Sequence, residues 1–83
     1  MILRVHVRVI PRSGLLDPQG QAVEHALAAL GFGGVADVRI GKAIELTLAA
    51  ETPEAAELSV RKMCEQLLAN PVTEDFVIEV EAR

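Results

Sequence analysis

The chain has 83 residues, a net charge of −4 and about half of its residues apolar, which indicates one small globular domain over residues 1–83. The acidic balance argues against nucleic-acid binding, which needs Lys and Arg to displace counterions from phosphate. With two Phe and no Trp or Tyr, the chain also lacks side chains on which bases could stack. A single cysteine excludes an internal disulfide, and the start holds no apolar run long enough for a signal peptide or membrane span. We therefore expect a cytoplasmic protein without membrane contact.

The first predicted element is a strand over residues 2–10, where apolar and polar residues alternate. This pattern buries one face of a strand and leaves the other to solvent. The apolar face holds Leu3, Val5, Val7 and Val9, and the polar face holds Arg4, His6 and Arg8.

A helix is predicted to begin at Asp17 and Pro18. Asp can accept a hydrogen bond from a free N–H of the first turn, and Pro suits the first helical position because its missing N–H is not needed there. We expect both residues to act as structural caps. An apolar stripe follows at Ala22, Val23, Ala26, Leu27 and Leu30, before Gly31 ends the helix.

Two alternating segments, 35–40 and 44–48, predict a β-hairpin around Gly41. A loop over 41–43 keeps the apolar residues of both strands on one face, whereas a slip of one residue would mix the faces. This register pairs Ile40 with Ile44 and places Arg39 opposite Glu45. Arg39 and Lys42 are then expected near the hairpin tip, pointing away from the helices.

The second helix is predicted to begin at Thr52 and Pro53, which repeat the cap pattern, and to end before Pro71. A last strand is predicted over residues 76–80. The apolar stripe of the helix consists of Ala56, Val60, Met63, Cys64 and Leu67.

The order β-α-β-β-α-β predicts an α+β fold, with an antiparallel sheet and both helices on one of its faces. So small a core, with one sheet face uncovered, favours a sheet that is extended or packed across an oligomer axis, so we expect at least a dimer. The uncovered face is predicted to carry Arg4, His6, Arg8, Asp37, Arg39, Glu45, Thr47 and Glu79.

No catalytic, cofactor-binding or metal-binding residue is predicted. Cys64 lies on an apolar stripe, which favours a buried structural thiol over a nucleophile. His6 and His25 lie on different elements and lack the further ligands that a metal site needs. The Gly-rich run 31–34 follows a helix, whereas a phosphate-binding loop opens one.

Arg39, Gly41 and Lys42 are the candidate partner-docking residues. Glycine followed by an exposed lysine is ordinary turn chemistry. The same residues could also present positive charge to a partner protein, and the sequence alone leaves both interpretations open.

Several segments together resemble the PurS proteins along nearly the whole chain. They are Asp17-Pro18-Gln19-Gly20 with the helix that follows, the central segment from Asp37 to Lys42, Met63-Cys64-Glu65, residues 67–70, and the acidic last strand. The order and spacing of these segments carry the resemblance, because each alone is only moderately specific.

The resemblance implies a non-catalytic subunit of formylglycinamide ribonucleotide amidotransferase in purine biosynthesis. Such a subunit joins the glutaminase PurQ to the ATP-dependent synthetase PurL, helps ammonia pass between them, and also forms dimers or tetramers. ATP and magnesium are then expected on the synthetase, and no cofactor in this chain. The alternative is a regulatory domain that senses a small molecule and dimerises through its sheet.

Overall fold

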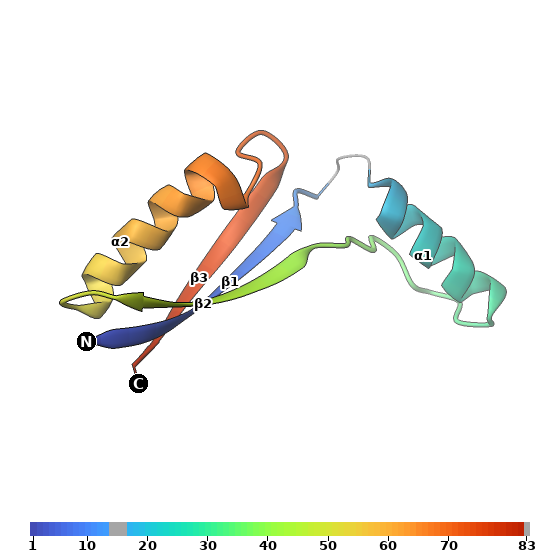
Figure 1. The fold of residues 1–83 in the computed structure, drawn as a ribbon. Helices are drawn as coiled ribbons and strands as arrows, with labels where there is room; N and C mark the ends of the chain where they lie inside the picture. Colours follow the sequence, from blue (N-terminus) through green and yellow to red (C-terminus); the bar gives the residue numbers. More distant parts are fainter. Residues whose placement is uncertain (14–16, 83) are drawn as a thin grey trace.

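The computed structural model describes residues 1–13 and 17–82 and confirms the α+β class. Three strands and two helices follow in the order β1 (Ile2–Pro11), α1 (Pro18–Ala29), β2 (Lys42–Ala49), α2 (Pro53–Met63) and β3 (Glu74–Ala82), and a π-helical turn, η1 (Cys64–Leu68), extends α2. The sheet is antiparallel with the order β2-β1-β3, so β1 lies at its centre (Figure 1).

The core lies between the sheet and α2, which crosses one sheet face (Figure 1). The alternation in β1 sends every second side chain to this face, where α2 and η1 cover them. The buried residues are Leu3, Val5, Val7, Val9, Ala56, Val60, Cys64 and Ala69. The opposite face is covered by neither helix, and we call it the open face.

The strand predicted over residues 35–40 is not formed, so the hairpin and its register are corrected. Asp37 takes a left-handed backbone conformation with φ of 56°, which interrupts an extended strand. The Val38 N–H donates to Glu24 Oε1 (3.4 Å) and the Ile40 N–H donates to Asp17 Oδ2 (2.9 Å). Because side chains of the α1 region take these donors, β2 pairs with β1 instead, placing Ile44 opposite Val7.

Only α2 lies on the sheet, whereas the sequence predicted both helices there. Helix α1 extends away from the sheet (Figure 1), and its one buried residue is Gly20. Val23 is 38% exposed and Leu30 is 73% exposed. The radius of gyration is 16.1 Å, against about 12 Å for a compact domain of this length, because α1 and the segment after it form an arm.

The base of this arm is a close contact between α1 and Val38. A Cβ on Gly20 would lie 2.1 Å from the Val38 carbonyl oxygen and 2.7 Å from Asp17 Oδ2. Only glycine therefore fits at this position. Asp17 does occupy the N-cap position, with Pro18 next to it, but its carboxylate makes no cap hydrogen bond. It holds Ile40 instead, which corrects the predicted cap.

Helix α2 begins as predicted: Thr52 Oγ1 accepts the Ala55 N–H at 3.0 Å, and Pro53 is the first helical residue. The end differs from the prediction. In η1 the Ala69 N–H donates to the Cys64 carbonyl oxygen, five residues back. This wider turn shifts the buried face by one or more residues, so Leu67 is exposed while Ala69 is buried.

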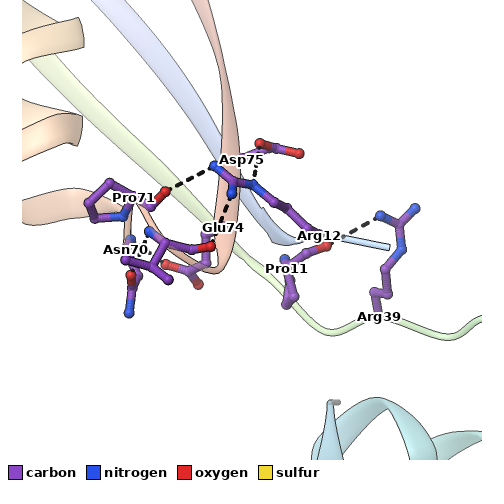
Figure 2. A network of polar contacts seen from close by, with 8 residues as sticks. Pro11, Arg12, Arg39, Asn70, Pro71, Glu74 and Asp75 are labelled. Carbon is purple, nitrogen blue, oxygen red and sulfur yellow. Dashed lines mark hydrogen bonds and ion pairs between the residues drawn. The ribbon is translucent and has the colours of Figure 1, made fainter. Parts of the chain in front are cut away.

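Arg12 fastens the loop before β3 to the end of β1 (Figure 2). Its guanidinium contacts Asp75 Oδ1 at 3.0 Å and donates to the carbonyl oxygens of Val72 (3.0 Å) and Pro71 (2.9 Å). The Asp75 carboxylate is therefore already paired within its own chain.

Candidate docking surface

The three predicted docking residues lie together where the chain returns from the arm into β2, although no hairpin tip exists there. Gly41 precedes β2 and packs closely on β1. A Cβ on Gly41 would lie 2.2 Å from the Val9 carbonyl oxygen and 3.2 Å from Ile10 Cα. Close backbone packing is therefore a sufficient reason for glycine at this position.

Arg39 contacts its own chain. Its Nη1 donates to the Pro11 carbonyl oxygen at 3.3 Å (Figure 2), and its Nε lies 3.9 Å from Asp37 Oδ2. The predicted pair with Glu45 is not formed, because residues 35–40 do not lie beside β2. Arg39 thus helps to hold the arm at the end of β1.

Lys42 is exposed and makes no ion pair within the described residues. In the register of β1 and β2, Lys42 lies opposite Val9, whose side chain is buried in the core. Cross-strand neighbours project to the same face of a sheet, so Lys42 lies on the face that carries α2. The sequence had placed it pointing away from the helices.

The open face carries a row of basic side chains along β1, with acids on both neighbouring strands. Arg4 Nη1 lies 3.3 Å from Glu45 Oε1. His6 Nε2 lies 3.0 Å from Glu81 Oε2, and His6 Nδ1 lies 4.0 Å from Glu45 Oε2. A shallow hollow of about 470 Å³ lies over this region. The sequence indicated the polar character of these residues, but their pairs depend on the order of the strands.

Cys64 is fully buried, and burial raises the pKa of its thiol, which keeps it protonated and away from solvent. In residues 1–13 and 17–82 no group of three or more His, Cys, Asp or Glu side chains could hold a metal ion. No described helix is long and apolar enough to cross a membrane. What the surface offers is charged and apolar side chains for contact with another protein.

Comparison with known proteins agrees with this description. A family model described as "PurS: Phosphoribosylformylglycinamidine (FGAM) synthase" matches residues 4–82. The chain is 47% identical over 78 residues to the PurS subunit of phosphoribosylformylglycinamidine synthase from Bacillus subtilis, covering 94% of this chain and 92% of the relative. It is 40% identical over 70 residues to the same subunit from Methanocaldococcus jannaschii, covering 84% of each chain.

Solved structures share the fold along almost the entire chain. The PurS structure from Bacillus subtilis has a TM-score of 0.82 at 45% identity and covers 96% of this chain and 99% of that chain. A chain of the PurLQS structure from Thermotoga maritima has a TM-score of 0.86 at 35% identity and covers 96% and 98%. With a family model, curated relatives and solved structures all in agreement over nearly its full length, the chain belongs to the PurS family.

Proposed function

We propose that this chain is a non-catalytic assembly subunit of phosphoribosylformylglycinamidine synthase. The observation that carries the proposal is the match of nearly the whole chain to a chain of the Thermotoga maritima PurLQS structure. Further support comes from Cys64, whose thiol is buried away from solvent, and from the open face, which presents charged side chains suited to contact with another protein.

In this proposal the chain joins two larger subunits. The glutaminase PurQ releases ammonia from glutamine, and the synthetase PurL uses ATP to activate the amide oxygen of formylglycinamide ribonucleotide. Ammonia then displaces the activated oxygen to give the amidine. The chain holds the two subunits together in the cytoplasm and aids the transfer of ammonia, while ATP and magnesium stay with the synthetase.

The proposal includes self-association into a dimer or tetramer. The apolar side of α1 meets no sheet in its own chain, and β2 and β3 are both edge strands. Exposed apolar surface and unpaired strand edges are both features that a second copy can cover. Lys42 remains a candidate contact to a larger subunit, since its ammonium has no partner within the described residues.

The alternative, a small-molecule-sensing domain, receives no support from the comparisons, whose curated relatives are all PurS subunits. The direct test is co-expression with PurL and PurQ, with the affinity tag on PurL only. We expect this chain to co-purify with PurL at a fixed stoichiometry. Its absence from the purified complex would contradict the assembly role.

A further inference from the structure

The open face has an acidic end, formed by side chains of both edge strands. Glu45 on β2, with Glu79 and Glu81 on β3, lines the hollow of about 470 Å³. Arg4 and His6 of β1 lie among these acids and contact Glu45 and Glu81. Glu79 is exposed and makes no ion pair or hydrogen bond with any described residue. The acidic end therefore keeps one carboxylate that can bind a cation of another molecule.

The end of the open face nearest the arm is basic. A hollow of about 210 Å³ lies there, lined by Arg8 and Arg39 together with Asp75. The Asp75 carboxylate is already paired with Arg12 at 3.0 Å. Arg8 is exposed and has neither an ion pair nor a hydrogen bond with any described residue. The basic end therefore keeps one guanidinium that can bind an acid of another molecule.

The balance of charge has opposite signs at the two ends. Three arginines lie near two aspartates at the basic end, and three glutamates lie near one arginine and His6 at the acidic end. A partner surface of a single sign would be repelled by one of the two ends. The surface that matches the open face therefore carries the same two ends in reverse order.

A second copy of this chain has such a surface. When two open faces meet about a two-fold axis that runs across β1, their strands point in opposite directions. The basic end of each copy then lies over the acidic end of the other. Glu79 lies opposite His6, the position next to Arg8 on the open face. Contacts about a two-fold axis are reciprocal, so Arg8 of each copy can meet Glu79 of the other.

Apolar side chains lie between the two charged ends. Val77, which is 55% exposed, lines both hollows, and Ala43 lies opposite Arg8 on β2. Sheets that pack face to face lie about 10 Å apart and interdigitate such side chains. Contact between two copies would bury this apolar surface and shield the ion pairs from water. A carboxylate can accept two parallel hydrogen bonds from a guanidinium in such a contact.

The open face is separate from α1, which extends away from the sheet (Figure 1). The apolar side of α1 provides one contact between copies in the proposed function. A second contact through the open face would join two such dimers. The chain therefore has surfaces for two different two-fold interfaces, which together can build a tetramer.

We propose that a second copy of this chain docks on the open face in the antiparallel orientation, through reciprocal contacts between Arg8 and Glu79. This inference rests on the self-association that the proposed function includes, and it adds the surface and its two contact residues. Both residues act in recognition and have no part in the chemistry of the complex.

The test is sedimentation velocity of Arg8→Glu and Glu79→Arg, each alone and as an equimolar mixture. Each variant alone opposes like charges at both contacts of the two-fold interface, so we expect self-association to weaken by about tenfold or more. In the mixture, the introduced glutamate of one chain meets the introduced arginine of the other. The native Glu79 of the first chain also meets the native Arg8 of the second. We therefore expect the mixture to recover wild-type association, and to lose it at high salt as the wild type does.

The matched controls are Lys62→Glu and Glu65→Arg, which make the same two changes of charge on exposed residues on the other side of the sheet. Both should associate like wild type. Arg8→Glu and Glu79→Arg should keep the wild-type melting temperature, because neither residue has an ion pair or hydrogen bond with a described residue of its own chain.

Three outcomes would overturn a part of this account. Wild-type association of either single variant would remove the open face as an interface and leave self-association through α1 standing. Weakened single variants whose mixture does not recover would also overturn the inference, because the two residues would then not meet each other. A monomeric wild type would refute the self-association in the proposed function itself.

Discussion

Asp17 links two segments 23 residues apart through one hydrogen bond, to the Ile40 N–H. That N–H lowers the pKa of the Asp17 carboxyl below its ordinary value of 3.8, and the nearby N–H groups of Gly20 and Gln19 act in the same direction although neither makes a cap hydrogen bond. A carboxyl whose pKa is lower in the folded state stabilises that state in its ionised form. The contribution of Asp17 to stability is therefore complete at pH values above its ordinary pKa. It is lost as the pH falls through the lower pKa that the carboxyl has in the folded state.

Comparing wild type with Asp17→Asn from pH 6 to pH 2 tests this contact. The amide keeps the size of the side chain but cannot ionise. We expect wild type to protect the Ile40 N–H from hydrogen exchange better than the variant above about pH 4. The difference in protection should shrink as the pH falls further. A difference that stays constant over this range would show that ionised Asp17 does not hold Ile40.

At Gly20, the expected effect of an alanine substitution on stability is the opposite of what helix propensity alone predicts. Alanine in place of a helical glycine usually stabilises a helix by about 1 kcal/mol. At Gly20 the added Cβ would lie 2.1 Å from the Val38 carbonyl oxygen, and such overpacking costs about 1–3 kcal/mol. We expect Gly20→Ala to accelerate hydrogen exchange of the Val38 and Ile40 N–H groups.

Gly33→Ala is the matched control, since a Cβ there would meet nothing within 4 Å. It should leave both exchange rates unchanged. Slower exchange in Gly20→Ala would contradict the close contact between α1 and Val38.

Helix α1 is the element whose structure most needs a partner. Its apolar residues face no sheet in their own chain, so we expect at least a dimer in sedimentation at micromolar concentration. Val23→Glu should shift the equilibrium toward monomer, because it places a charge on this apolar side. Leu58→Glu changes an exposed leucine of α2 and serves as the control. A monomeric wild type, or equal effects of both variants, would refute self-association through α1.

The elements that sequence analysis predicts best are those specified by local patterns. The alternation in β1 predicted its buried face, and Thr52 and Pro53 predicted the start of α2. Residues 35–40 alternate as well, yet their amides bond to Asp17 and Glu24, an interaction between distant residues that periodicity does not reveal. The apolar stripe of α1 was identified, but no local pattern tells which surface covers it.

The candidate site was predictable to a similar extent. Arg39, Gly41 and Lys42 are neighbours in sequence and lie together in the fold. The predicted pair of Arg39 with Glu45 and the predicted face of Lys42 were wrong, because both depend on β2 pairing with β1.

The whole molecule is elongated, with extents of 50 × 26 × 14 Å. A half-covered sheet and an extended arm give a small chain more contact surface than a compact domain of equal length. This shape suits a subunit that contacts several proteins at once. The central claim is therefore that the chain enables a reaction catalysed elsewhere.

The most direct measurement of this claim is amidine synthesis by reconstituted PurL and PurQ, with and without this chain, using glutamine or added ammonia as the nitrogen source. We predict that glutamine-dependent synthesis requires the chain, that ammonia-dependent synthesis by PurL requires it much less, and that the chain alone has no activity. Equal glutamine-dependent rates without the chain would contradict the account, as would turnover by the pure chain that survives the Cys64→Ala substitution.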